Sequence, residues 1–123
     1  MKLRFRSNSL RLRLNRREVE ALASGTSLRE EVVFPNNAHF AYIFEPQAKT
    51  SPEASFKDGV IRIAAPLATL RDWAHSEAIG LYFEVASQSA SLRVAIEKDL
   101  ECVDGPAQER DPEAFPRSKE KVC

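Results

Sequence analysis

A short pattern that occurs twice places the strongest constraint on the fold of this chain. Residues 5–12 read FRSNSLRL and residues 56–63 read FKDGVIRI, so each contains an aromatic residue, a basic residue, a polar turn and an apolar–Arg–apolar strand. A stretch with helical spacing and two further strand-like stretches follow each copy. A repeat of this length is typical of a duplicated supersecondary unit. The sequence therefore predicts two tandem ββαββ repeats, over about residues 1–46 and 52–98.

The first repeat opens with a predicted β-hairpin. A two-residue turn at Asn8 and Ser9 would pair Phe5 with Leu12 and Arg4 with Arg13, and Asn suits such a turn because it tolerates positive φ. Since side chains alternate along a strand, Phe5 and the leucines then share one face. The opposite face carries four arginines: Arg4, Arg6, Arg11 and Arg13.

The remaining elements are predicted from local signals. Asn15 and Glu18 have the spacing of a helix capping box, and Gly25 is a suitable C-terminal stop. Residues 28–34 and 39–45 have the composition of strands. In the second repeat, a turn at residues 58–59 and a helix beginning near Pro66 precede strands at 80–86 and 91–98. Around that turn, the side chains expected to point inward are Phe56, Ile61 and Ile63.

These elements predict an α+β protein. Two ββαββ units are expected to share one curved antiparallel sheet, or a closed barrel, covered by two helices, because a flat sheet of eight strands would expose its edges. The duplicated domain covers residues 1–98, with a linker at 47–53. Residues 99–123 form a charged, Pro-containing tail that Phe115 could anchor to the domain.

The charge balance and the cysteine content narrow the class of protein. The formal net charge is zero, so no attraction of the whole molecule to nucleic acid or to anionic lipid is expected. Arginines interrupt any apolar run that would suit a secretory signal, and no run is long enough to span a bilayer. Two cysteines do not make a disulfide framework. The sequence therefore predicts a cytoplasmic protein with reduced thiols.

The arginines of the first hairpin are the leading candidates for a binding site. Guanidinium groups match the oxygens of phosphates and carboxylates, so Arg4, Arg6, Arg11 and Arg13 predict a face that binds a polyanionic small molecule. Arg62 is the equivalent of Arg11 in the second repeat. The simpler alternative is a solvated face whose arginines pair with surface acids or with the tail. Phe5 faces away from the arginines, which does not favour nucleic acid as the partner.

An enzyme is the alternative function. A barrel lined by these arginines would be similar to the triphosphate-tunnel phosphohydrolases and would predict a phosphate- or triphosphate-binding hydrolase. The chain lacks their Glu-x-Glu-x-Lys strand, of which Glu97 and Lys98 are only a fragment. Without those carboxylates, catalysis by a divalent metal has little support. The sequence also contains no Gly-x-Ser-x-Gly elbow and no phosphate-binding Gly-rich loop.

Metal and cofactor sites are not expected. The soft-metal candidates His39, His75, Cys102 and Cys123 do not have the spacing of a zinc site. Cys102 follows Glu101, and a negative neighbour raises the pKa of a thiol and lowers its reactivity.

Three segments carry a resemblance to a known family. Residues 2–14 (KLRFRSNSLRLRL), 94–102 (VAIEKDLEC) and 111–116 (DPEAFP) resemble a family of small bacterial proteins of unknown function. The resemblance covers nearly the whole chain and implies a stand-alone domain of bacterial, cytoplasmic origin. It supplies no activity, ligand or catalytic residue. The function predicted from the sequence is therefore a small non-enzymatic module that binds a polyanion or a protein partner.

Overall fold

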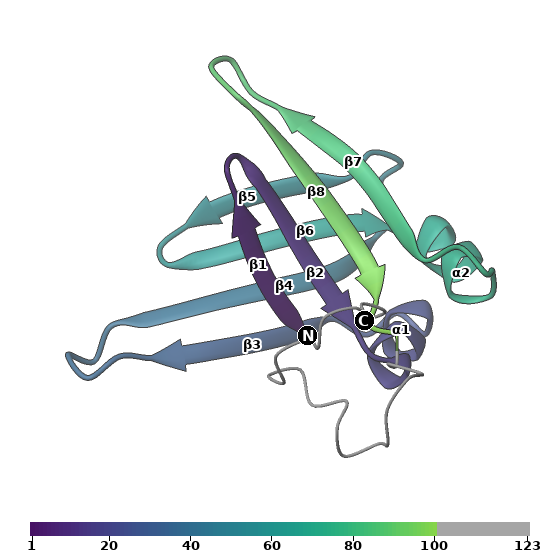
Figure 1. Cartoon of the computed structure of the whole chain (residues 1–123), viewed down its shortest axis with the longest axis horizontal. Coiled ribbons are helices and arrows are strands. Elements are labelled where there is room, and N and C mark those ends of the chain that lie inside the picture. Colours follow the sequence, from purple (N-terminus) through teal and green to yellow (C-terminus); the bar gives the residue numbers. More distant parts are fainter. Residues whose placement is uncertain (101–123) are drawn as a thin grey trace, which may run out of the picture.

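A computed structural model describes residues 1–100 and confirms the α+β class. Figure 1 shows the strands crossing in two layers, with the two helices together at one end of the molecule. The elements are β1 (Lys2–Arg6), β2 (Ser9–Leu14), α1 (Arg16–Ala23), β3 (Leu28–Val33), β4 (His39–Gln47), β5 (Glu53–Lys57), β6 (Val60–Pro66), α2 (Leu67–Ala74), β7 (Gly80–Ala86) and β8 (Ser91–Lys98).

The strands form two separate four-stranded sheets. Sheet A has the order β1-β2-β8-β7 and sheet B has the order β3-β4-β6-β5. The predicted closed barrel is therefore wrong, and so is the single curved sheet. Each hairpin is antiparallel, as predicted, but the central pairs β2–β8 and β4–β6 are parallel. Stacking the two sheets buries the apolar side chains of their central strands against each other, so closure is not needed to form a core.

The register of the first hairpin differs from the prediction by two residues. Arg4 lies opposite Arg11 and Phe5 opposite Leu10, so the turn consists of residues 7–8 rather than 8–9, and Ser7 has a φ of 51°. The side chain of Asn8 donates instead to the backbone oxygen of Ser91, at 2.7 Å. Because the shift is an even number, every side chain keeps its predicted face.

Helix α1 begins as the sequence predicts. The side chain of Asn15 accepts from the backbone N–H of Glu18, and the Glu18 carboxylate accepts from the backbone N–H of Asn15, both at 2.9 Å. Gly25 follows the helix with a φ of 93°, a conformation in which Gly is favoured. Helix α2 follows Pro66, the residue at its N-cap. The two helices contact each other and close one end of the space between the sheets.

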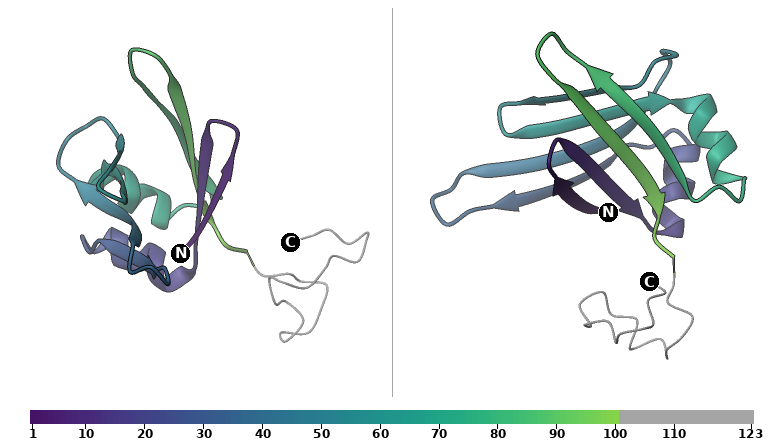
Figure 2. Two further views of the ribbon diagram at one scale, coloured as in Figure 1. Left: turned by 90° about the vertical axis from the view of Figure 1, so that its left-hand side faces the viewer. Right: turned by 45° about the horizontal axis from the view of Figure 1, so that its top comes forward.

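The core lies between the sheets and extends under the helices. Its fully buried large side chains are Leu12, Leu14, Leu22, Phe44, Ile63, Leu70, Val94 and Ile96. Phe5 and Phe56 were expected in this core, but they are 57% and 66% exposed. Both rings belong to edge strands, β1 of sheet A and β5 of sheet B, next to the hairpin turns, and Figure 2 shows the two sheets splayed apart on one side. The pattern predicted which face these rings are on, but not the splay of the sheets.

Fewer structural observations bear on the predicted domain limits and on the tail. Residues 48–52 connect β4 with β5, whereas the division at residue 98 stays a prediction. Cys102, Phe115 and Cys123 lie outside the described residues. Neither helix in residues 1–100 is long and apolar enough to cross a membrane.

Candidate anion-binding face

The outer face of sheet A brings together basic residues from three strands. Because side chains alternate, Leu10, Leu12, Val94 and Ile96 point into the core and their neighbours point outward. We call this outer surface the arginine face. Its three rows across the sheet are Arg6–Ser9–Arg93–Glu84, Arg4–Arg11–Ala95–Tyr82 and Lys2–Arg13–Glu97–Gly80.

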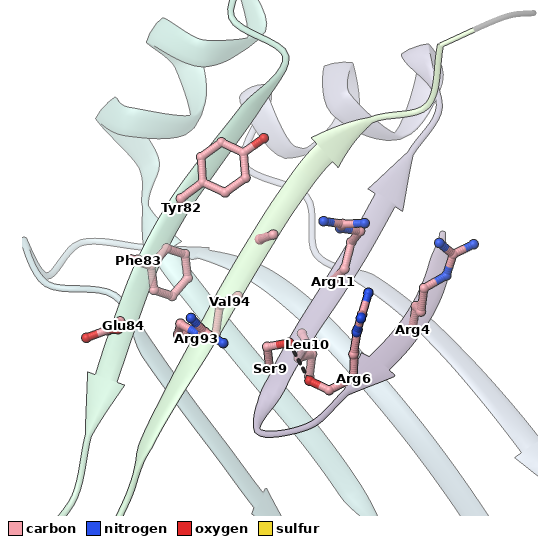
Figure 3. Close-up of a pocket in the computed structure, with 11 residues that line it drawn as sticks. Arg4, Arg6, Ser9, Leu10, Arg11, Tyr82, Phe83, Glu84, Arg93 and Val94 are labelled. Carbon is pink, nitrogen blue, oxygen red and sulfur yellow. Dashed lines mark hydrogen bonds between the residues drawn. The ribbon is translucent and has the colours of Figure 1, made fainter. Parts of the chain in front are cut away.

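A groove of about 570 Å³ lies on the arginine face. Figure 3 shows Arg4, Arg6 and Arg11 extending from β1 and β2 on one side of it, while Tyr82 comes from β7 on the other. The small residues of the central strands, Ser9 and Ala95, lie between these two sides and leave the groove open. The groove therefore has one side with three arginines and another side with the Tyr82 ring, Arg93 and Glu84.

Glu97 neutralises part of this surface. Its Oε1 lies 3.2 Å from Nε of Arg11 and 3.6 Å from Nε of Arg13, and its Oε2 accepts a hydrogen bond from the Tyr82 hydroxyl at 2.8 Å. Arg11 Nε is buried, and its N–H is not aligned for a hydrogen bond with any acceptor in residues 1–100. At the edge of the face, Lys2 pairs with Asp99 at 2.8 Å.

Three arginines of this face are left without such a partner. Within residues 1–100, no carboxylate oxygen lies within 4.0 Å of Arg4, Arg6 or Arg93. Arg4 also lies opposite Arg11 across the hairpin, and like charges that face each other in a sheet are destabilising. A bound anion would relieve this repulsion.

Arg62 does not join the other predicted site residues. It lies on β6 of sheet B, where its Nη1 donates to Oε1 of Glu45 at 3.0 Å. Arg11, its counterpart in the predicted repeat, is on the other sheet. The structure therefore groups Arg4, Arg6, Arg11 and Arg13, and it places Arg62 in a separate ion pair.

Tyr82 was missed in the sequence analysis as a member of this face. The ring is 63% exposed and lies over Gly80, where an added Cβ would be 2.7 Å from Cζ of Tyr82. The hydrogen bond to Glu97 raises the pKa of Tyr82, and partial burial adds to this effect, whereas Arg11 and Arg13 oppose it. The alternation of residues 80–86 does place Tyr82 opposite the apolar face, but it does not reveal which strand lies beside it.

A family comparison covers most of the chain. The model of a family of unknown function (DUF7009) matches residues 1–119. The chain belongs to this family. No curated protein and no solved structure matches it. DUF7009 membership agrees with the predicted resemblance to an uncharacterised family, and it brings no activity or ligand with it.

The histidines of this DUF7009 chain have other partners. His39 Nδ1 lies 2.7 Å from Oε2 of Glu31, and His75 Nδ1 lies 2.8 Å from the backbone oxygen of Arg71. The hydrogen bond with His39 lowers the pKa of Glu31. In the part of the chain that the structure describes, no three His, Cys, Asp or Glu side chains converge as metal ligands.

Proposed function

We propose that this protein is a non-enzymatic binding module whose arginine face binds a polyanionic small molecule. The observation that carries the proposal is the position of Arg4, Arg6 and Arg93 around the groove, without a carboxylate partner in residues 1–100. Guanidinium groups form charge-assisted, often bidentate hydrogen bonds with phosphate and carboxylate oxygens. The unpaired groups supply such donors from neighbouring strands.

The charge of the whole face favours the same ligand class. Six basic side chains, Lys2, Arg4, Arg6, Arg11, Arg13 and Arg93, share the rows of the face with two carboxylates, Glu84 and Glu97. A third carboxylate, Asp99, pairs with Lys2 at the edge. A concave surface lined by one sign of charge raises the local concentration of the opposite ion. This excess of positive charge is local, since the formal net charge of the chain is zero.

The hydrolase alternative loses its structural basis. It required arginines lining the lumen of a barrel, but the sheets are not closed, and Arg4, Arg6, Arg11 and Arg13 lie on the face of sheet A that points away from the core. The carboxylates nearest to them, Glu84 and Glu97, belong to no metal-binding group in the described residues. The binding module is therefore the function that the arrangement supports.

Calorimetric titration with inorganic tripolyphosphate tests the proposal. We expect binding that weakens between 50 and 300 mM salt, as electrostatic attraction is screened over about 10 Å at 0.1 M. The variant Arg4→Gln/Arg6→Gln should lose about tenfold or more in affinity. The control Arg16→Gln/Arg17→Gln removes the same charge from the exposed start of α1 and should bind like the wild type. An absence of binding, or an equal loss in the control, would contradict the proposal.

We also propose that the two halves of the chain arose by duplication. If β1, β2, α1, β3 and β4 are matched in order with β5, β6, α2, β7 and β8, the order β1-β2-β8-β7 becomes β5-β6-β4-β3. That is the order of sheet B read from its other edge, and the parallel pair β2–β8 then corresponds to β6–β4.

We further propose a cytoplasmic location for the protein. This proposal rests on the low cysteine content of the sequence.

A further inference from the structure

The arginine face also has features that indicate which class of anion it binds. We infer that its ligand is a nucleoside polyphosphate, with the base on the ring of Tyr82 and the phosphates against Arg4 and Arg6. This inference rests on the proposed function and adds the identity of the ligand class. Four observations on the same face support it: the fixed ring, the spacing of the strands, the distribution of the charge and the number of aromatic side chains.

The ring of Tyr82 is exposed and yet held in place. Tyr82 is 63% exposed, its hydroxyl donates to Glu97 at 2.8 Å, and its hydroxyl end lies over Gly80, in the space that a Cβ on residue 80 would need. A ring fixed in this way loses little conformational freedom when a ligand stacks on it, and such preorganisation increases affinity. The exposed ring is thus a suitable platform for a flat, uncharged group.

The spacing between the strand that carries Tyr82 and the strands that carry the arginines suits a nucleotide. Tyr82, Ala95, Arg11 and Arg4 occupy one row across four adjacent strands. Neighbouring strands are about 4.8 Å apart, so the backbone at Tyr82 is roughly 10 Å from Arg11 and roughly 14 Å from Arg4. The methyl side chain of Ala95 occupies the position between them. A ligand with a base at one end, a sugar in the middle and phosphates at the other end fits this order.

Most of the positive charge on the face lies away from the Tyr82 ring, just as the phosphates of a nucleotide lie away from its base. The two carboxylates of the rows, Glu84 and Glu97, come from β7 and β8, near the aromatic side, together with one arginine, Arg93. Arg4, Arg6 and Arg11 come from β1 and β2. A single-stranded nucleic acid would carry phosphates past the ring and toward these carboxylates. A mononucleotide places its negative charge only on the arginine side.

The number of aromatic side chains agrees with one base. Among the three outward rows of sheet A, Tyr82 is the single aromatic residue. Phe5 and Phe83 are in the rows between and point to the other face. Proteins that bind single strands stack successive bases on several aromatic side chains. One platform therefore favours a mononucleotide over a nucleic acid strand.

The test compares ATP with inorganic tripolyphosphate, both titrated calorimetrically into the full chain in buffer with EDTA. Stacking on one aromatic side chain changes affinity by about tenfold, so ATP should bind about ten times more tightly than tripolyphosphate. Tyr82→Ala should reduce ATP affinity to that of tripolyphosphate and leave tripolyphosphate binding unchanged. The control Phe56→Ala removes an equally exposed ring from sheet B and should change neither affinity. Thermal unfolding checks that both variants fold.

The outcomes separate this inference from the proposed function. Equal affinity for ATP and tripolyphosphate in the wild type, or ATP binding that does not depend on Tyr82, would overturn the nucleotide and leave the anion-binding face intact. Tighter binding of a six-residue oligouridine than of ATP would overturn it in favour of a nucleic acid strand. If neither ATP nor tripolyphosphate binds, both the inference and the proposed function are wrong.

Discussion

The Tyr82 ring lies over Gly80 so closely that a Cβ on residue 80 would be 2.5 Å from the phenol oxygen and 2.7 Å from Cζ. Residue 80 is at the start of an edge strand, and no left-handed backbone conformation requires glycine there. The close approach of the ring is therefore the contact that a larger residue at position 80 would disturb. Because the nearest atoms belong to the end of an exposed side chain, the ring can move away from a larger residue without disturbing the core.

Substitution Gly80→Ala tests this relationship directly. We expect the added methyl group to displace the ring of Tyr82 and break its hydrogen bond with Glu97, while the free energy of unfolding changes by less than about 1 kcal/mol, because alanine is tolerated at an edge position. The measurement is a urea denaturation curve together with a spectrophotometric titration of the tyrosines. If the tyrosines of the wild type and of the variant titrate over the same pH range, the prediction is wrong. Gly25→Ala is the control for the tyrosine titration, which it should leave unchanged because nothing lies within 4 Å of its Cβ; its φ of 93° should cost stability of its own.

The ionisation of Tyr82 should depend on Glu97. The hydrogen bond favours the neutral phenol and raises the pKa of Tyr82 above its usual 10.0. A raised folded-state pKa contributes stability that is fully present below pH 10 and is lost as the pH rises through that pKa. In a Tyr42→Phe background, which leaves one of the two tyrosines, Glu97→Ala should move the alkaline titration of Tyr82 to lower pH. An unchanged titration midpoint would mean that the hydrogen bond does not persist in solution.

The turn between β5 and β6 requires glycine for a stronger reason. Gly59 has a φ of 77°, and a Cβ there would be 2.8 Å from the backbone oxygen of His39. Gly59→Ala should therefore destabilise the protein by about 1–3 kcal/mol. Gly25 has a φ of 93° but open space around it, so Gly25→Ala should cost less. Thermal or urea unfolding gives both values, and an equal loss in the two variants would show that the contact with His39 contributes nothing.

The capping box of α1 should contribute measurably to stability. Removing the Asn15 side chain leaves the backbone N–H of Glu18 without its acceptor, so Asn15→Ala is expected to lower the free energy of unfolding by about 1 kcal/mol. Glu20→Gln, an exposed change on the same helix, is the matched control and should have little effect. If both variants unfold at the same urea concentration as the wild type, the cap is not important for stability.

The acidic tail is expected to compete with anions for the arginine face. It lies outside the described residues, and its sequence concentrates acids after the end of sheet A, including Asp104, Glu109, Asp111 and Glu113. Truncation after Val103, or neutralisation of the last three of these acids to amides, should increase tripolyphosphate affinity at low salt. The increase should shrink at 300 mM salt because exposed charges are then screened. Unchanged affinity at 50 mM salt would reject competition by the tail.

Sequence reasoning was most successful where an interaction joins residues a few positions apart. The capping box of Asn15 and Glu18 needs only the helical spacing. The turn at Asp58 and Gly59 needs only residues that tolerate positive φ. The side of the sheet on which the arginines lie also followed from the alternation of side chains, because an error of two residues in the register leaves each side chain on the same face.

Sequence reasoning was less successful where a distant strand decides the outcome. The first turn was placed one residue late because Asn8 hydrogen-bonds to Ser91, which belongs to the last hairpin. Arg93, Glu97 and Tyr82 reach the arginine face through the parallel pairing of β2 with β8. Alternation indicates that such residues point outward, but it contains no information about the neighbouring strand.

The sequence by itself determined the order of strands and helices, the helix cap and the side of each strand that is apolar, because these depend on interactions between residues close together in the chain. The tertiary structure decided that the hairpins divide between two sheets rather than close into one barrel, that the sheets splay and expose Phe5 and Phe56, and that Arg62 is separated from the other arginines. The physical reason is that apolar burial is not directional. The same apolar faces can be covered in several ways, and the packing of the whole chain selects one of them.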